Sequence, residues 1–420
     1  MKTDKITRDK IDRSRRNFLK TLSLTGAGIA LGGVPAIVQS QKKDIAIGCV
    51  VSLTGFMSLD GETMKEGLEL AIEDLNAKGG LLGRQVTALY RDDETSPPIA
   101  IRRFNELVKT QGIVMHSGIV HGGVAAAILQ ANKTLGDSGV VCFQTVQTPT
   151  MKTPQTMDPL LFFSGISQES MGSTAGEYAV KNLGKKGFLI YPDYVLGWTQ
   201  RDSLKPMVEA NGGELVGMIA VPQTTNDFQP FLTQILAKQP DWVANIFPGM
   251  MNVNFVRQAH SMGLKNKMKI VSTLVNIEEI NAIGPEAAKD VIIVCDYFWN
   301  LPNEKNKMFV ERFMKKFGNE RRPSMRHFEQ HVAVTMWANA VQKAGTLDPK
   351  TVASAMLNMK YDYGKGESYT RTTGDHTFVT PIIVARGKGP NEMKDKFDTQ
   401  EILQINTAEK YYYSPKELGW

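Results

Sequence analysis

The chain has few cysteines, little net charge beyond its N-terminus and no familiar catalytic motif. Its 420 residues include three cysteines, Cys49, Cys142 and Cys295, and each lies in an apolar run. We expect these thiols to be buried and inert, and the pattern is not that of a disulfide framework. The net charge of +6 is concentrated in the first twenty residues. The rest of the chain is nearly neutral, which argues against a nucleic-acid partner.

The sequence also lacks the usual signatures of enzymes. It contains no Gly-x-Ser-x-Gly elbow, no phosphate-binding loop and no Cys-x-x-Cys pair. His327 and His331 share one helix face, a spacing that can hold zinc, but Glu329 is misplaced for a metalloprotease motif and no third ligand is apparent. We therefore predict a protein without a cofactor or a metal, and we favour a binding protein over an enzyme.

The N-terminus carries an export signal. Residues 14–20, Ser-Arg-Arg-Asn-Phe-Leu-Lys, match the twin-arginine pattern, and residues 21–40 carry no charge. Several glycines and Pro35 make this stretch only mildly apolar, which favours a cleaved signal over a retained anchor. We predict that residues 1–40 are a twin-arginine signal peptide, that the twin-arginine translocase handles the chain during export, and that the mature protein is periplasmic.

Residues 45–94 set the pattern for the rest of the chain. The apolar run at 45–51 predicts a buried strand, residues 52–61 a loop, the following stretch to Leu75 a helix, and residues 85–90 a second strand. A strand–helix–strand crossover implies a parallel sheet, in which ligands bind beyond the carboxyl ends of the strands. The loop with Phe56 and Met57 is thus either a ligand loop or a plain connection.

The same order of strand, loop and helix recurs along the chain. Further strands are predicted at 112–116, 140–144 and 162–166, and a second unit has strands at 187–191, 214–221, 242–247, 269–273 and 291–295. Helices at 305–317 and 327–344 follow, and the last sixty residues show one clear strand at 378–384. The fold class is therefore α/β, with two Rossmann-like lobes that each contain a central parallel sheet.

Three N-terminal motifs resemble one known family. They are Ser52-Leu53-Thr54-Gly55, the run Leu-Asn-Ala-Lys-Gly-Gly-Leu-Leu-Gly-Arg at 75–84, and Arg91-Asp92-Asp93-Glu94. They are similar to the leucine/isoleucine/valine-binding proteins, which are type I periplasmic receptors of ABC importers, and the likeness extends over residues 44–389. It implies two hinged, discontinuous lobes, residues 44–165 with 300–360 and residues 166–299 with 361–420, that close around a ligand.

The resemblance and the helix pattern together indicate a carboxylate site in the first lobe. His121, Gly122 and Gly123 precede a helix, whose N-terminal N–H groups favour an anion. The family uses hydroxyl groups in this loop, so here the backbone and His121 would do more of the binding. The alternative is a tight turn that needs glycine. The segment that contains Val146, Gln147 and Thr148 matches the second ligand loop of the family. The alternative is that these residues serve only to form a turn.

The second lobe departs from amino-acid receptors. Tyr194 matches an aromatic residue that covers the ligand, but Pro248 and Met250 replace the aromatic residue expected after residue 247. The acid that pairs with the ligand ammonium is missing around Leu274. An unpaired buried ammonium would cost several kcal/mol. We therefore expect a carboxylate or amide with an apolar or aromatic body rather than an ordinary α-amino acid.

These observations predict an exported receptor that presents a small organic ligand to the membrane subunits of an ABC permease. The alternative is a sensor of the same fold that reports to a signalling partner. An enzyme ranks third, because no nucleophile–base pair or metal constellation is visible.

Overall fold

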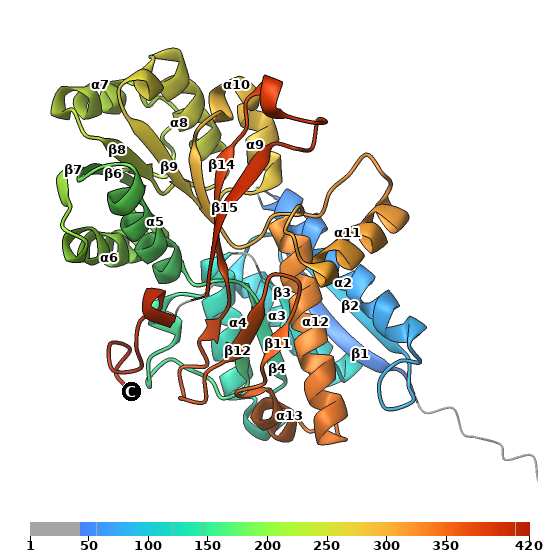
Figure 1. Ribbon diagram of the computed structural model, residues 1–420. Coiled ribbons are helices and arrows are strands. Elements are labelled where there is room, and N and C mark those ends of the chain that lie inside the picture. The colour runs from blue at the N-terminus through green and yellow to red at the C-terminus, as the bar shows by residue number, and fades with distance from the viewer. Residues whose placement is uncertain (1–42, 56, 120, 146, 408) are drawn as a thin grey trace, which may run out of the picture. The chain divides into compact units, whose positions relative to one another are not determined.

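Two sheets organise the chain (Figure 1). The computed structural model describes residues 43–420 except positions 56, 120, 146 and 408, so the predicted signal peptide and the site residues Phe56 and Val146 lie outside the described residues. The first sheet has five strands in the order β2-β1-β3-β4-β5, all parallel. Its strands are β1 (Ile45–Val51), β2 (Val86–Asp92), β3 (Met115–Ile119), β4 (Val141–Gln144) and β5 (Leu161–Phe163).

Helices cover both faces of this first sheet. They are α2 (Ser58–Ala77), α3 (Pro97–Glu106), α4 (Gly122–Thr134) and, from much later in the chain, α12 (Met325–Ala344). The crossover from β1 to β2 and the crossover from β2 to β3 run in opposite directions across the sheet. Because such crossovers are right-handed, α2 and α3 lie on opposite faces. α2 packs against α12, and α3 packs against α4. Because both faces are covered, the strands are apolar on both sides, as in the fully buried β3 and β4.

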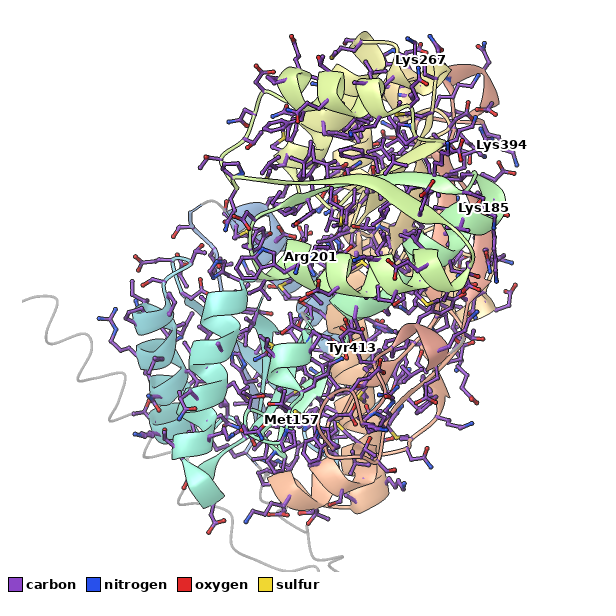
Figure 2. The ribbon with its side chains drawn as sticks, turned by 90° about the vertical axis from the view of Figure 1, so that its left-hand side faces the viewer. Met157, Lys185, Arg201, Lys267, Lys394 and Tyr413 are labelled. Carbon is purple, nitrogen blue, oxygen red and sulfur yellow. The ribbon has the colours of Figure 1, made fainter. Side chains whose placement is uncertain are left out.

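The second sheet has seven strands in the order β15-β14-β10-β9-β8-β6-β7. β6 to β10 are parallel, whereas β14 and β15 run antiparallel at one edge. The strands are β6 (Lys186–Pro192), β7 (Glu214–Val221), β8 (Trp242–Asn245), β9 (Lys269–Thr273), β10 (Ile292–Cys295), β14 (Ile382–Gly387) and β15 (Gln400–Asn406). The helices of this half are α5 (Gln168–Asn182), α6 (Val195–Ala210), α7 (Gln229–Lys238), α8 (Met250–Ser261), α9 (Ile277–Ile283) and α10 (Pro285–Ala288). In Figure 2 side chains fill the space around each sheet.

The chain returns to the first sheet after β10. Helix α11 (Glu304–Phe317) is tied to α2 by ion pairs from Arg312 to Asp74, at 2.6 Å, and from Lys316 to Glu73. Helix α12 then packs along α2. The predicted α/β class with two parallel sheets and a discontinuous chain is confirmed.

A small antiparallel sheet follows: β11 (Tyr361–Asp362), β12 (Glu367–Thr370) and β13 (Phe378–Val379), reached through α13 (Pro349–Met356). It lies beside the first sheet, since His376 Nδ1 is 2.9 Å from the Leu161 carbonyl oxygen. From the sequence we predict that all of residues 361–420 belong to the second lobe, and the contact of His376 with Leu161 places part of that segment against the first sheet. The residue limits of the lobes stay a prediction.

Other details differ from the sequence-based elements. The sequence also predicts a helix at 255–262, and α8 begins five residues earlier, at Met250, because the Glu279 carboxylate accepts the Gly249 N–H and so caps its first turn. The predicted strand at 378–384 is split into β13 and β14 around Pro381, which has no N–H to donate. The sequence did not predict α3, α9, α10 or α13.

The three cysteines are buried and unpaired, as predicted, and burial raises the pKa of each thiol. Among the described residues, no helix has both the length and the apolar character needed to cross a membrane.

Candidate functional site

Each parallel sheet contains one point at which the strand order reverses. In the first sheet it lies between β1 and β3, and in the second between β6 and β8. Crossover helices leave to opposite sides there, and the resulting crevice beyond the carboxyl ends is the usual binding site of such sheets. The loops at these two points hold most of the predicted site residues, namely Met57, His121, Gly122, Gly123, Tyr194, Pro248 and Met250.

The loop after β1 is fixed by the acidic loop after β2. Ser52 Oγ donates to Asp93 Oδ1 at 2.6 Å, Thr54 Oγ1 donates to Asp92 Oδ2 at 2.6 Å, and the Leu53 N–H donates to Asp92 Oδ1 at 3.0 Å. The hydroxyl groups of this motif therefore hold the loop in shape. Met57, which precedes α2, packs against the hydrophobic core.

The start of α4 presents open backbone donors. Gly122 and Gly123 are exposed and begin the helix, so their N–H groups have no acceptor within it. A Cβ atom on Gly122 would meet nothing within 4 Å, whereas one on Gly123 would lie 3.1 Å from His121 Cε1. The His121 ring thus lies over Gly123, and His121 interacts electrostatically with Asp93. The arrangement can hold a carboxylate at the helix N-terminus.

The segment after β4 is held in place by hydrogen bonds of its own side chains. Gln147 is fully buried, and its amide donates to the carbonyl oxygens of Gly165 and Phe378 while accepting the Phe378 N–H at 3.2 Å. The Thr148 hydroxyl lies 2.9 Å from that of Thr150. Gln147 therefore ties β4 to β13, and a role for these two side chains in ligand binding stays a prediction.

The loops of the second sheet carry aromatic and apolar side chains. Tyr194 precedes α6 and is half-buried, which raises the pKa of its hydroxyl to about 12. Met250 is 61% exposed, and Pro248 is half-buried. Leu274 follows β9 with a φ of 59°. Its side chain packs against two separate clusters of buried hydrophobic residues. A left-handed leucine is uncommon, so the backbone there is held by its surroundings.

One important residue was missed by the sequence reasoning. Glu279, in the first turn of α9, is 8% exposed and accepts hydrogen bonds from the Gly249 N–H and from Asn252 Nδ2, both at 3.1 Å. It joins the loop after β8 to the helix after β9. Burial raises its pKa to about 8, and the charges of Asp60 and Glu278 add to this. The signal was present, since Asn276 three residues before Glu279 is a helix-capping pattern.

The interaction with Asp60 is informative because Asp60 belongs to the first turn of α2. The starts of α2 and α9, which follow strands of different sheets, are therefore close enough for their charges to interact. Asp60 also pairs with Arg326 Nε at 3.0 Å, and Arg326 Nη1 contacts Glu329 Oε2 at 2.8 Å. Burial raises the pKa of Glu329 to about 8, against the charge of Arg326. This partly buried network supports the loops of the first sheet.

The histidine pair has structural contacts. His327 lies 3.0 Å from the Ser324 N–H, which it helps to cap, and its Nε2 is 2.9 Å from Glu66. His331 packs against Phe309, and burial lowers its pKa to about 4. Over residues 43–420, apart from the four positions left out, no group of three His, Cys, Asp or Glu side chains could hold a metal ion.

Comparison with known proteins agrees with this geometry. The family model described as periplasmic binding protein matches residues 44–394. A Leu/Ile/Val-binding protein of Rhizobium johnstonii is 28% identical over 277 residues, which cover 65% of this chain and 72% of the relative. A leucine-, isoleucine-, valine-, threonine- and alanine-binding protein of Pseudomonas aeruginosa is 25% identical over 361 residues, which cover 84% and 92% of the two chains.

Solved structures share the fold. An amino acid ABC transporter substrate-binding protein of Pseudomonas fluorescens has a TM-score of 0.82 at 22% identity and covers 90% of this chain and 99% of its own. A solute-binding protein of Rhodopseudomonas palustris in complex with benzoate has a TM-score of 0.73 at 22% identity, with 86% and 96% covered. The resemblance seen in the sequence motifs is confirmed, and the chain belongs to the leucine/isoleucine/valine-binding family of type I periplasmic binding proteins.

Proposed function

We propose that the protein is an exported receptor that binds a small organic carboxylate with an apolar or aromatic body and presents it to an ABC permease. The ligand lies between the two reversal points of the sheets. Its carboxylate accepts hydrogen bonds from the start of α4, and its body contacts Met57, Tyr194 and Met250. The receptor turns nothing over. The observation that carries the proposal is that two exposed glycines, Gly122 and Gly123, begin α4 and contribute its first N–H groups.

The carboxylate part rests on the electrostatics of a helix end. α4 runs from Gly122 to Thr134, and its first turn has no acidic residue. Free N–H groups and the helix dipole both favour an anion at that position. Gly122 also leaves space, because no described residue other than its chain neighbours and the backbone of α4 has an atom within 4 Å of the position that a Cβ would take. A ligand oxygen can therefore approach the backbone without displacing a side chain.

The apolar part rests on exposed side chains at the starts of other helices. Leu59 on α2, Val195 and Trp198 on α6, and Met250 on α8 are 64%, 42%, 41% and 61% exposed. Large apolar side chains gathered near a binding crevice favour a ligand with an apolar body. The benzoate complex of the Rhodopseudomonas palustris protein shows that a chain of this fold accommodates such a ligand.

Among the described residues, no carboxylate stands at the position directly after β9, where amino-acid receptors of the family carry one. Leu274 occupies the position after β9. The Glu279 carboxyl nearby is already bonded to Gly249 and Asn252, and its raised pKa of about 8 favours the neutral form. Simple carboxylates therefore suit the site better than zwitterions, for which burial of an unpaired charge is costly.

The test uses isothermal titration with benzoate, isovalerate, leucine and valine. Benzoate or isovalerate should bind, and the amino acids should bind at least about tenfold more weakly. Gly122→Pro removes one donor but suits the first helical position, because His121 before it is already extended, with φ −99° and ψ 127°. It should weaken carboxylate binding by about tenfold or more, the effect of a charge-assisted hydrogen bond.

The matched control is Gly122→Ala, which keeps the N–H group and has space for its methyl group. It should bind within about twofold of the natural protein. Equal binding by Gly122→Pro would show that α4 does not hold the carboxylate. Preferential binding of leucine would replace the ligand class with amino acids.

The export signal is tested separately. Replacement of Arg15 and Arg16 by lysine should abolish appearance of the protein in the periplasmic fraction, because the translocase reads this pair. Unchanged export would contradict the twin-arginine assignment.

A sensor that acts on a signalling partner is the second candidate. Stimulation of a permease ATPase by the ligand-loaded protein supports transport, whereas a change in kinase activity without such stimulation supports sensing.

A further inference from the structure

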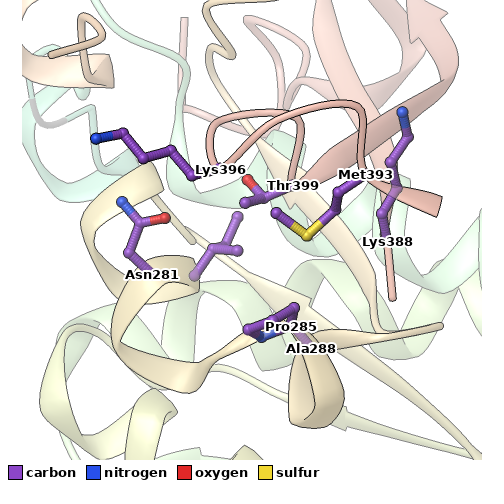
Figure 3. A pocket seen from close by; sticks show the side chains of 8 residues that line it. Asn281, Pro285, Ala288, Lys388, Met393, Lys396 and Thr399 are labelled. Atoms are coloured by element: carbon purple, nitrogen blue, oxygen red, sulfur yellow. The ribbon is translucent and has the colours of Figure 1, made fainter. Parts of the chain in front are cut away.

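The pocket shown in Figure 3 offers a ligand little to recognise. It lies between α9–α10 and residues 388–399, its walls are largely apolar, and each of its two lysines is paired with an acid. Arg326, by contrast, reaches the crevice at the first sheet, and its contacts leave part of the guanidinium unbonded.

Arg326, in the first turn of α12, lies where the strand order of the first sheet reverses. Its Nε donates to Asp60 Oδ1 at 3.0 Å, and Asp60 comes after the loop that follows β1. Its Nη1 lies 3.4 Å from the hydroxyl of Thr145, the residue after β4. That hydroxyl in turn donates to the carbonyl oxygen of Ile119, at the end of β3. The guanidinium is therefore beside the carboxyl ends of β1, β3 and β4, where ligands bind in such sheets.

The same ion pair is close to the second sheet. The charges of Arg326 and Asp60 both act on Glu278, which lies in the first turn of α9 and so follows β9. Arg326 and Asp60 thus lie between the loops of the two sheets, which is where the proposed function puts the ligand.

The guanidinium of Arg326 is only partly used by the protein. Nε bonds to Asp60, and Nη1 bonds to Glu329 Oε2 at 2.8 Å and to Thr145. Nη2 hydrogen-bonds to no described residue, yet it still reaches solvent, although the side chain as a whole is only 11% exposed. An arginine that two acids hold in place, with N–H groups to spare, is preorganised to bind an oxygen atom.

Asp60 offers the complementary group on the same ion pair. Its Oδ1 accepts from Arg326, whereas its Oδ2 accepts no hydrogen bond from any residue that the structure describes and is open to solvent, with the side chain 29% exposed. The pair therefore presents one free donor, Nη2, and one free acceptor, Oδ2. A hydroxyl group matches both, because its single oxygen can accept one hydrogen bond and donate another.

The charges around the pair disfavour other ligand groups. Arg326 and Asp60 have opposite charges, and Glu278 lies nearby, so a second carboxylate on the ligand would meet little net attraction. An ammonium group has only donors and would leave the Nη2 N–H groups without an acceptor. A neutral hydroxyl avoids both problems.

We propose that Arg326 and Asp60 select a hydroxyl group on the ligand. The hydroxyl oxygen accepts a hydrogen bond from Arg326 Nη2, and its proton is donated to Asp60 Oδ2. The inference rests on the proposed function, because it assigns a second group of the ligand whose carboxylate lies at the start of α4. The preferred ligands are therefore hydroxylated aromatic acids.

The test is isothermal titration with benzoate, meta-hydroxybenzoate and para-hydroxybenzoate. At least one hydroxybenzoate should bind about tenfold more tightly than benzoate, the effect of hydrogen bonds to charged groups. The ratio of the two dissociation constants is the quantity to follow, because changes that affect only the carboxylate cancel in it.

Two variants remove the two halves of the hydroxyl site. In Asp60→Asn the amide oxygen keeps the bond from Arg326 Nε, so the NH₂ group replaces the free acceptor Oδ2. Arg326→Lys keeps the positive charge and removes Nη2. In each variant the hydroxybenzoate should lose its advantage and bind within about twofold of benzoate.

The matched control is Glu62→Gln, which removes a 52% exposed acid from the same end of α2 and should leave the ratio unchanged. Gly122→Pro should weaken the binding of all three acids and also keep the ratio. Benzoate binding with no gain from either hydroxyl, or a gain that survives in Asp60→Asn, would overturn this inference and leave the proposed function standing. Tighter binding of para-(aminomethyl)benzoate than of either hydroxybenzoate would overturn it too, and no binding by any of these acids would contradict both proposals.

Discussion

Replacement of Glu279 by glutamine should make the protein more stable at alkaline pH and change little at acid pH. The carboxyl of Glu279 is 8% exposed and has a pKa of about 8 against an ordinary value of 4.5. Burial is the main cause, and the nearby charges of Asp60 and Glu278 add to it. Since one pKa unit corresponds to about 1.4 kcal/mol, the ionised form costs the folded state about 5 kcal/mol.

The direction follows from proton binding. Below pH 4.5 the carboxyl is protonated in both the folded and the unfolded chain, so folding buries no charge and its ionisation does not lower the free energy of unfolding. Between pH 4.5 and pH 8 only the unfolded chain loses the proton, so the free energy of unfolding falls as pH rises. Above pH 8 both forms are ionised and the loss is complete. Glu279→Gln does not titrate, so its advantage should grow by about 4 kcal/mol between pH 5 and pH 8.5.

Glutamine also suits the contacts of this site. Its carbonyl oxygen can accept the Gly249 N–H in place of the carboxylate. Its NH₂ group would face Asn252, whose Oδ1 has no hydrogen-bond partner among the described residues. A flip of the Asn252 amide would then pair the two groups. The substitution therefore removes the charge and keeps a hydrogen bond to both Gly249 and Asn252.

The measurement is urea unfolding of both proteins between pH 5 and pH 8.5, with Glu214→Gln at an exposed position of β7 as the control. The titration of Glu329 affects both proteins equally and cancels in the difference. A constant difference across this pH range, or one that grows toward acid pH, would refute the reasoning.

Three other substitutions test the structure in urea unfolding. Gly61→Ala would place a Cβ 1.8 Å from the Ser52 carbonyl oxygen, so it should cost about 3 kcal/mol or more. Lys365→Met leaves the buried carboxylate of Asp296 without its cation and should cost about 3–5 kcal/mol. Gln147→Leu leaves three buried main-chain groups without their partner and should cost about 2–3 kcal/mol or more.

These three predictions have internal controls. Gly122→Ala meets no atom within 4 Å and should change stability by less than about 1 kcal/mol. Addition of Asp296→Leu to Lys365→Met should recover part of the lost stability, because no charge is then left unpaired. A tolerated Gly61→Ala, or a double variant less stable than Lys365→Met alone, would contradict the packing described.

Local patterns in the sequence predicted the two parallel sheets, and most of the predicted site residues lie where the strand order of these sheets reverses. The apolar run of β1 and the helix α2, which is followed by glycines, form a strand–helix unit that recurs along the chain. The strand order reverses once among the parallel strands of each sheet. Motif recognition identified the family through the residues around Ser52 and Asp92. The structure adds the reason for that motif, since the two loops hydrogen-bond to each other.

The parts that sequence reasoning missed depend on partners far along the chain. Gln147 is predicted to bind the ligand because its segment after β4 matches a ligand loop of the family, and its amide also bonds to Phe378, 231 residues away. Nothing near Gln147 in the sequence reveals that contact. Glu279 was overlooked for a similar reason, since its importance comes from Gly249 and from Asp60 on another helix. Periodicity describes each helix but not what faces its ends.

The position of α12 late in the chain constrains how the protein can fold during its synthesis. The helix that covers α2 is complete only at Ala344, and the second sheet gains its last two strands only between Ile382 and Asn406. During synthesis, neither half can finish folding until most of the chain has left the ribosome. A single cut between β10 and α11 would leave two fragments that each lack part of a sheet or its covering helices, so the halves should not be obtained separately by one cut.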